Sequence, residues 1–251
     1  MNPFSLENEL ALITGGGTGL GLAIAQCFIE AGARVVIAGR RQAVLDTALE
    51  QLGPAAHSRV FDVVDFAGAD DLLASIEREI GPVSILVNNA GNQITKPSED
   101  MTVAEFQAVM DTHVTGAFSL SRAVIPGMKA RQHGNILFTA SMASLFGLPN
   151  VISYSAAKSA YAGMVRTMSV ELAAHGVRVN AIAPGWIESD LMRRAMDADP
   201  ARARRVLQRT PMGHFGEAVD IGWAAVYLCS PAAKFVTGVM FPVDGGVSIG
   251  F

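Results

Sequence analysis

The chain has 251 residues, of which half are hydrophobic and 17% are charged, and its formal net charge is -4. This balance predicts no nucleic-acid partner, and two distant cysteines, Cys27 and Cys229, predict neither a disulfide framework nor a metal site. The sequence shows no secretory leader and no apolar run of the roughly 18 residues that a membrane span needs. We therefore expect a cytoplasmic protein without a membrane partner, folded as one domain over residues 1–251.

Short β-branched segments alternate along the chain with longer segments of helical periodicity. The expected strands are Leu10–Thr14, Arg34–Gly39, His57–Asp62, Ser84–Asn88, Asn135–Thr139, Arg178–Ala183 and Met240–Val243. The expected helices are Leu20–Ala31, Gln42–Leu52, Ala69–Ile80, Thr102–Ala130, Ser153–His175 and Ala218–Ser230. Nearly continuous apolar strands are typical of a parallel sheet that is covered on both faces. We predict an α/β fold of the Rossmann type, a doubly wound parallel seven-stranded sheet with helices on both faces.

Residues 187–216 interrupt this alternation, because they contain no expected strand and are rich in arginine and methionine. A long insertion after the carboxyl end of a strand predicts a substrate lid. The arginines indicate either a solvated helical face, which we favour, or a patch for an anionic substrate; they are Arg193, Arg194, Arg202, Arg204, Arg205 and Arg209. Met192, Met196 and Met212 are suited either to a substrate pocket or to packing of the lid on the core.

A glycine-rich loop follows the first expected strand, with the sequence Thr14-Gly15-Gly16-Gly17-Thr18-Gly19-Leu20-Gly21. Glycines at such a loop let the backbone approach a pyrophosphate at the amino end of the next helix. An NAD enzyme needs an acidic residue about 20 positions further on, to bind the ribose 2′-hydroxyl. This chain has Arg40 and Arg41 there, which favours NADP(H), while NAD(H) remains possible. The alternative is that both arginines only begin a solvated helix.

Further motifs appear in order along the chain. They are Asp62-Val63, Asn88-Asn89-Ala90-Gly91, Ser141, Tyr154-Ser155-Ala156-Ala157-Lys158 and Pro184-Gly185-Trp186-Ile187. Together with the glycine-rich loop, they resemble the short-chain dehydrogenase/reductase family, in its single-domain branch, over nearly the whole chain. The resemblance implies that the cofactor is contacted by Gly15, Thr18, Gly19, Leu20, Gly21, Arg40, Arg41, Asp62, Val63, Asn89, Ala90, Gly91, Tyr154, Lys158, Pro184, Gly185, Ile187 and Ser189. Ser189 stands where the family more often has threonine.

Three residues predict the chemistry. Reduction of a ketone needs a proton on oxygen, and the unperturbed pKa of tyrosine, about 10, is too high for rapid exchange at neutral pH. Lys158 lies four positions after Tyr154, so a helix places both on one face, where the ammonium charge would lower the pKa of Tyr154. Ser141 can donate a hydrogen bond to the substrate oxygen as charge develops.

His113 is a departure from the family, which usually has asparagine at this position, where it helps to hold a water molecule that links the lysine to bulk solvent. The backbone carbonyl of His113 can still hold that water if the helix is locally distorted. The imidazole itself can join the proton relay, since histidine titrates near ~6.5. The alternative is a histidine that is packed and hydrogen-bonded inside, without a role in proton transfer.

These observations predict an NADP(H)-dependent oxidoreductase that interconverts a secondary alcohol and a ketone, with a polyol or sugar acid as the preferred substrate. The alternatives are a 3-oxoacyl-thioester reductase, a catalytically inactive dinucleotide-binding regulator, and an epimerase or dehydratase, for which the chain is short. The resemblance also implies a homotetramer with long helices paired between subunits. A charged fraction below the ~25% usual for soluble domains agrees with covered surfaces.

Overall fold

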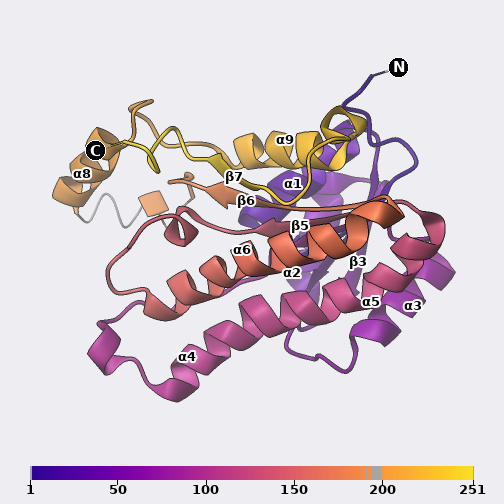
Figure 1. Ribbon diagram of the computed structural model, residues 1–251, viewed down its shortest axis with the longest axis horizontal. Helices are drawn as coiled ribbons and strands as arrows, with labels where there is room; N and C mark the ends of the chain where they lie inside the picture. Colours follow the sequence, from indigo (N-terminus) through magenta and orange to yellow (C-terminus); the bar gives the residue numbers. More distant parts are fainter. Residues whose placement is uncertain (1, 190–191, 194–198, 251) are drawn as a thin grey trace.

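The computed structural model describes residues 2–189, 192–193 and 199–250. Over these residues, parallel strands form one sheet in the order β3-β2-β1-β4-β5-β6-β7 (Figure 1). The strands are β1 (Leu10–Thr14), β2 (Arg34–Gly39), β3 (Ala56–Val60), β4 (Ile85–Asn88), β5 (Gly134–Thr139), β6 (Val177–Pro184) and β7 (Met240–Val243). The seven-stranded Rossmann-type sheet predicted from the sequence is confirmed.

The strand order reverses beside β1. The chain runs outward from β1 through β2 to β3 and then returns to the other side of β1 with β4. Leu12 therefore pairs with both Val36 and Leu86. The connections that leave β1 and β4 diverge, and such a reversal opens a crevice at the carboxyl ends of the strands, where doubly wound sheets bind their ligands.

Helices cover both faces of the sheet (Figure 1). The helices are α1 (Gly19–Glu30), α2 (Gln42–Leu52), α3 (Ala69–Glu79), α4 (Val103–Met110), α5 (Gly116–Arg131), α6 (Ile152–Leu172), α8 (Pro200–Arg209) and α9 (Ala218–Cys229), with 3₁₀ turns η1 (Ser98–Asp100), η3 (Met142–Ser144), η4 (Ala173–His175) and η5 (Pro231–Ala233). Helices α1, α2 and α9 pack on one face, where Phe28 and Ile221 are fully buried. Helices α3, α5 and α6 pack on the other face, with Tyr161 against Phe138. Burial of these two apolar layers is the main stabilising contribution, and it gives the loops at the sheet edge a rigid base.

The long helix predicted for Thr102–Ala130 consists of three elements. Helix α4 begins at a capping box, in which Thr102 Oγ1 accepts the N–H of Glu105 (3.2 Å) and Glu105 Oε2 accepts the N–H of Thr102 (2.9 Å). A π-helical turn, η2 (Asp111–Thr115), then separates α4 from α5. The turn spans only five residues, which is too few for its wider hydrogen-bond spacing to appear in the periodicity of the sequence.

One predicted strand end also differs from the structure. Strand β3 ends at Val60 rather than Asp62, because Asp62 begins a turn in which its Oδ1 accepts the N–H of Val64 (3.2 Å). The segment 187–216 contains α8 and a parallel bridge between Ile187 and Gly216. Over the described part of the chain, no helix is both long and apolar enough to cross a membrane.

Candidate active site

The glycine-rich loop is tied to the loop that follows β4. Thr14 Oγ1 accepts the backbone N–H groups of Asn89 and Ala90, each at 3.0 Å, and Asn89 Nδ2 donates to the carbonyl of Thr14 at 3.0 Å. Gly15 has φ +64°, and a Cβ there would lie 3.0 Å from the Cα of Ala90. A larger residue at Gly15 would therefore strain the backbone and push the two loops apart.

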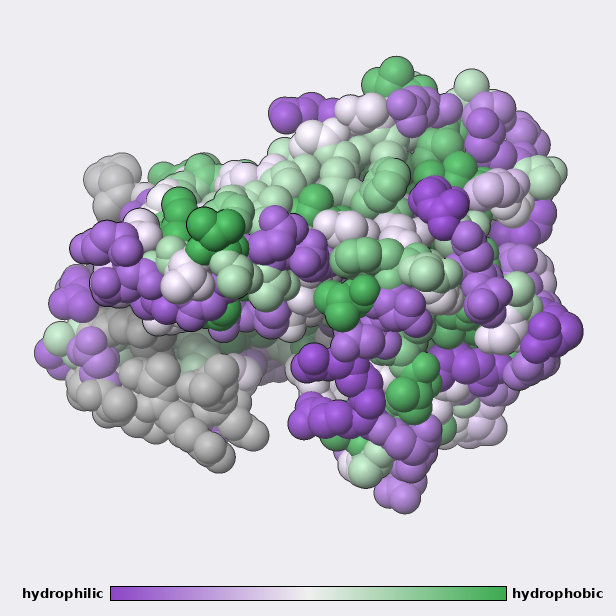
Figure 2. Space-filling view, turned by 90° about the horizontal axis from the view of Figure 1, so that it is seen from below, coloured by the Kyte–Doolittle hydropathy of each residue, from purple (hydrophilic) through white to green (hydrophobic). Residues whose placement is uncertain are grey.

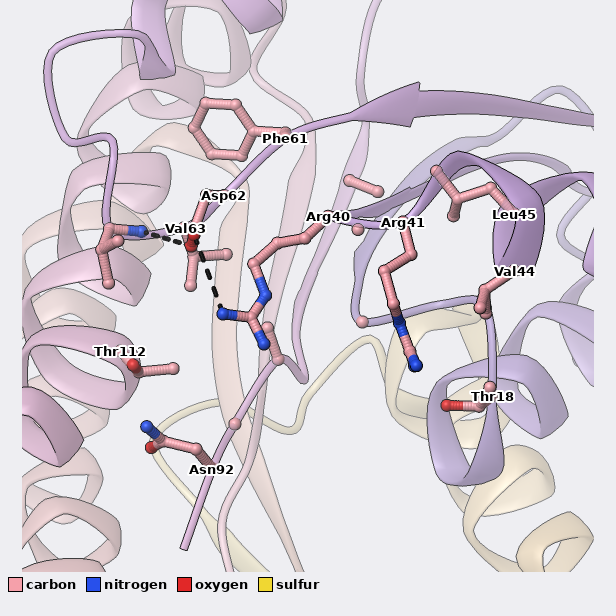
Figure 3. Close-up of a pocket in the computed structure, with 17 residues that line it drawn as sticks. Thr18, Arg40, Arg41, Val44, Leu45, Phe61, Asp62, Val63, Asn92 and Thr112 are labelled. Carbon is pink, nitrogen blue, oxygen red and sulfur yellow. Dashed lines mark hydrogen bonds and ion pairs between the residues drawn. The ribbon is translucent and has the colours of Figure 1, made fainter.

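A cavity of about 230 Å³ opens beside this loop at the carboxyl ends of β1, β2 and β4 (Figure 3). Of the predicted cofactor residues, its walls include Gly15, Thr18, Arg40, Arg41, Asp62, Val63, Ala90 and Gly91. The sequence interpretation missed other lining residues, which are Gly17, Ala38, Gly39, Val44, Leu45, Phe61, Val64, Asn92 and Thr112. Gly17 and Asn92 lie within or next to recognised motifs, and Thr112, which reaches the cavity from η2, directly precedes His113.

The two arginines at the end of β2 differ in their surroundings. Arg40 directs its guanidinium toward Asp62, with 3.9 Å between Nη1 and Oδ2, and its side chain is 76% exposed. Arg41 extends toward Thr18 on the other side of the cavity (Figure 3). Both cations therefore border the space where a ribose 2′-phosphate would be bound by charge-assisted hydrogen bonds.

The remaining predicted cofactor residues do not line this cavity; they are Gly19, Leu20, Gly21, Asn89, Tyr154, Lys158, Pro184, Gly185, Ile187 and Ser189. Asn89 and Gly21 have packing roles, because a Cβ on Gly21 would lie 2.6 Å from Asn89 Nδ2. Gly185 is in close contact with the chain after β7, since a Cβ on it would lie 2.6 Å from Asp244 Cα. Ser189 Oγ accepts the N–H of Met192 at 3.1 Å.

Ser141, Tyr154 and Lys158 lie together at the carboxyl end of β5. Ser141 follows β5, is 7% exposed, and accepts the N–H of Ala143 at 3.1 Å. Tyr154 and Lys158 are one turn apart on α6, with Lys158 Nζ 5.6 Å from the centre of the Tyr154 ring. The structure thus brings together the three residues that the sequence selected for proton transfer.

Lys158 is almost fully buried, at 3% exposure. Its Nζ donates to the carbonyl of Thr139 at 2.5 Å, and it lies 5.1 Å from the centre of the Tyr161 ring. Burial lowers the pKa of Lys158 from 10.5 to about 7, because the charged ammonium loses its hydration.

The pKa of Tyr154 differs from the sequence-based expectation. Burial raises the pKa of this phenol above 10.0, and the side-chain interaction with Ser141 acts in the opposite direction without reversing the shift. The net lowering of the Tyr154 pKa that the sequence predicts is therefore wrong for this structure, in which desolvation of the tyrosinate is the largest effect.

His113 is buried within η2 and packs between the loop after β4 and helix α6. Its Nε2 lies 3.1 Å from the backbone nitrogen and 2.8 Å from the carbonyl oxygen of Asn92, and its ring meets the Tyr154 ring edge-on at 5.6 Å. Burial and the charge of Lys158 lower the pKa of His113 to about 3. The ring is therefore neutral near pH 7, and the hypothesis that it relays protons by titrating near 6.5 is wrong. The local helix distortion is present, but the carbonyl of His113 accepts a hydrogen bond from Tyr161.

The described arginines of residues 187–216 have different surroundings. Arg193 pairs with Glu188 at 3.1 Å, Arg209 lies 4.3 Å above the Phe146 ring, and Arg204 and Arg205 are exposed. Met192 is half-buried and Met212 is exposed. Arg194, Met196 and the side chain of Arg202 lie outside the described residues.

Comparison with known proteins agrees with this geometry. The family profile described as enoyl-(acyl carrier protein) reductase matches residues 15–248. Gluconate 5-dehydrogenase from Gluconobacter oxydans (strain 621H) is 36% identical over 249 residues, which cover 98% of this chain and 97% of that protein. The NADP-dependent (R)-specific alcohol dehydrogenase of Lentilactobacillus kefiri is 38% identical over 246 residues, 96% of this chain and 97% of that one.

A similar solved structure is that of a gluconate 5-dehydrogenase from Burkholderia cenocepacia J2315 in complex with NADP and tartrate. Its TM-score is 0.94 at 34% identity, and the match covers 100% of this chain and 99% of that one. The fold and the crevice define a dinucleotide-binding protein of the Rossmann type. The chain belongs to the short-chain dehydrogenase/reductase family.

Proposed function

We propose that this chain is an NADP(H)-dependent oxidoreductase that interconverts a secondary alcohol and a ketone. The observation that carries the proposal is the grouping of Ser141, Tyr154 and Lys158 at the carboxyl end of β5. These side chains supply what the proton half of the reaction needs, namely a proton donor, a hydrogen-bond donor and a cation. The retention of all three disfavours a regulator that has lost catalysis.

In ketone reduction, Tyr154 transfers its proton to the carbonyl oxygen, while the Ser141 hydroxyl donates a hydrogen bond to the same oxygen as negative charge develops. The ammonium group of Lys158 stabilises the tyrosinate that remains. Because the pKa of Lys158 is about 7, this stabilisation is present below that pH and weakens above it. A bound nicotinamide supplies the hydride in reduction and accepts it in oxidation.

The lining of the cavity suits the adenosine 2′-phosphate and the pyrophosphate of NADP(H). Gly15 and Gly17 let the backbone approach a pyrophosphate, and a Cβ on Gly15 would close on Ala90. Arg40 and Arg41 would hold the 2′-phosphate, and the nearby carboxylate of Asp62 is paired with Arg40. The relatives named as NADP-dependent or solved with NADP support the same choice.

We favour a polyol or sugar acid as the substrate, because both gluconate 5-dehydrogenases match nearly the whole chain. A 3-oxoacyl thioester is the alternative, which the description of the matching family profile suggests. Residues 187–216 would serve as the substrate lid of a single domain over residues 1–251. A cytoplasmic location is consistent with the buried free thiols of Cys27 and Cys229.

We also propose a homotetramer. Helices α4, α5 and α6 expose large apolar side chains, including Val103 (86%), Phe118 (50%) and Val170 (82%). Figure 2 views the face on which α4 and α5 lie, where apolar residues are interspersed with polar ones. Mixed surfaces of this kind suit an interface between subunits. Size-exclusion chromatography with light scattering should give about four times the 26.4 kDa chain mass, and a monomer would contradict the proposal.

The first test is a fluorescence titration of the purified protein with NADPH and with NADH. Tighter binding of NADPH is expected, followed by NADP⁺-dependent oxidation of gluconate or galactitol. Tighter binding of NADH would contradict the cofactor assignment, and turnover of only a 3-oxoacyl thioester would contradict the substrate class.

The second test is Tyr154→Phe, which removes the proton donor and keeps the ring. The substitution should lower kcat by about 10²- to 10⁴-fold, the usual contribution of a general acid, while NADPH binding is retained. Unchanged turnover would remove the catalytic assignment of Tyr154.

A further inference from the structure

Tyr161 links the catalytic helix to the π-helical turn. It lies on α6, three residues after Lys158, and is completely buried. Its hydroxyl donates a 2.8 Å hydrogen bond to the carbonyl oxygen of His113 in η2. Its ring packs against Phe138 of β5, with 5.0 Å between the ring centres. The side chain therefore fills the space between three elements that surround the catalytic residues.

The carbonyl of His113 has a partner from outside its helix turn. A π-helical turn changes the regular hydrogen-bond ladder, and carbonyl groups released in this way are usually satisfied by water or by a side chain. A buried carbonyl without a partner is costly. In this chain the hydroxyl of Tyr161 provides such a partner.

Lys158 lies between two tyrosine rings. Its Nζ is 5.1 Å from the centre of the Tyr161 ring and 5.6 Å from that of Tyr154, while it donates to the carbonyl of Thr139. The ring of Tyr161 therefore covers one side of the ammonium group, and a face of this kind attracts a cation without hydrating it. At 3% exposure, Lys158 has almost no contact with bulk solvent.

We propose that Tyr161 is a positioning residue for Lys158: its hydroxyl ties α6 to η2 through the His113 carbonyl, and its ring covers one side of the ammonium group, which lies between Thr139 and Tyr154. The inference rests on the proposed function in one respect, namely that the ammonium group of Lys158 stabilises the tyrosinate of Tyr154. Desolvation by burial lowers the pKa of Lys158 to about 7, so the cover that the Tyr161 ring gives the ammonium group also helps to set the pH range in which its charge is present.

The test is Tyr161→Phe, with Tyr227→Phe as the matched control. Tyr227 lies on α9, across the sheet, where its ring packs near Phe4 and Phe241. Loss of the Tyr161 hydroxyl frees the His113 carbonyl and leaves room beside Lys158 for water, so the pKa of Lys158 should rise. The decrease in the rate of ketone reduction on the alkaline side should then move to higher pH by roughly half a unit or more. An unmoved pH profile in folded Tyr161→Phe protein, or an equal movement in Tyr227→Phe, would overturn the proposal.

A second measurement does not depend on activity. A group with a folded-state pKa below its unfolded value of 10.5 releases its proton earlier in the folded protein, so the free energy of unfolding rises between about pH 7 and 10.5. Lys158→Met removes this contribution. The free energy of unfolding is measured with and without Lys158→Met, and the difference between the two values is followed with pH. This difference should change less with pH when Tyr161→Phe is also present than when Tyr161 is intact. Equal pH dependence in both backgrounds would overturn the role of Tyr161 even if no substrate is turned over.

Discussion

Arg40 and Arg41 have the same side chain and adjacent positions, yet their electrostatic surroundings differ. Arg40 shares its charge with Asp62, whereas Arg41 has no ion pair within the described part of the chain and extends toward Thr18 (Figure 3). A cation that is already paired has less free energy to gain from a phosphate. Arg41 is therefore expected to contribute more to the choice of NADP(H) over NAD(H).

Arg41→Ala should weaken NADPH binding by about tenfold or more, since a charge-assisted hydrogen bond contributes roughly 1.5–3 kcal/mol. NADH binding should change little, because NADH lacks the 2′-phosphate. Dissociation constants from nicotinamide fluorescence measure both effects. Arg78→Ala, on the exposed side of α3, serves as the control. An equal weakening of NADH and NADPH binding would show that Arg41 does not bind the 2′-phosphate.

At the scale of elements, the contact between η2 and the loop after β4 aligns the active site. The ring of His113 lies so close to Gly91 that a Cβ on Gly91 would approach His113 Cε1 to 2.3 Å. The same ring contacts Tyr154 and the backbone of Asn92. The neutral imidazole thus acts as a spacer between the cofactor side and the catalytic helix.

Gly91→Ala should destabilise the protein by roughly 1–3 kcal/mol, the usual effect of overpacking in a core, and should lower kcat by displacing His113 toward Tyr154. Chemical denaturation and steady-state kinetics measure the two effects. Gly163→Ala is a suitable comparison, because a Cβ on Gly163 of α6 meets nothing within 4 Å. That variant should be neutral or stabilised by up to about 1 kcal/mol, as alanine favours helix over glycine. A Gly91→Ala protein as stable and active as Gly163→Ala would refute the spacer role.

At the scale of the whole molecule, an ion pair at the amino edge of the sheet connects the residue before β1 with the residue before β5. His133 Nε2 lies 2.9 Å from Glu9 Oε1, just before β5 and β1 respectively. The hydrogen bond to Glu9 raises the pKa of His133 above 6.5. Burial tends to raise the pKa of Glu9, but hydrogen bonds from His133 and Ser84 outweigh it, so the pKa falls below 4.5.

The pKa shifts of His133 and Glu9 together define the pH range in which the ion pair stabilises the fold. The stabilisation from the raised histidine is fully present below pH 6.5 and is lost as the pH rises through its folded-state pKa. The stabilisation from the lowered carboxyl is present above pH 4.5 and is lost as the pH falls through its folded-state pKa. His133→Gln should therefore reduce the free energy of unfolding most between about pH 4.5 and 6.5, by up to ~1 kcal/mol for a partly exposed pair. Urea denaturation at pH 5.5 and 9 measures the difference, and an equal loss at both values would exclude the ion pair as its source.

The sequence alone determined the class of sheet, a doubly wound parallel one, and the common helical face of Tyr154 and Lys158, because both depend on local spacing. Apolar runs with turn residues between them specify parallel strands, and the separation of Tyr154 and Lys158 places them on one helical face. Glycines after the first strand, and arginines after the second, likewise predicted the walls of the cavity.

Only the tertiary structure decided the protonation of these groups and the neighbours that control it. Burial, rather than sequence spacing, sets the pKa of Lys158, Tyr154 and His113. The role of Tyr161 arises from a π-helical turn that the sequence pattern does not show, and its partner is a backbone carbonyl 48 positions away. Desolvation and long-range hydrogen bonds depend on which segments pack together, and that information is absent from any local stretch of the chain.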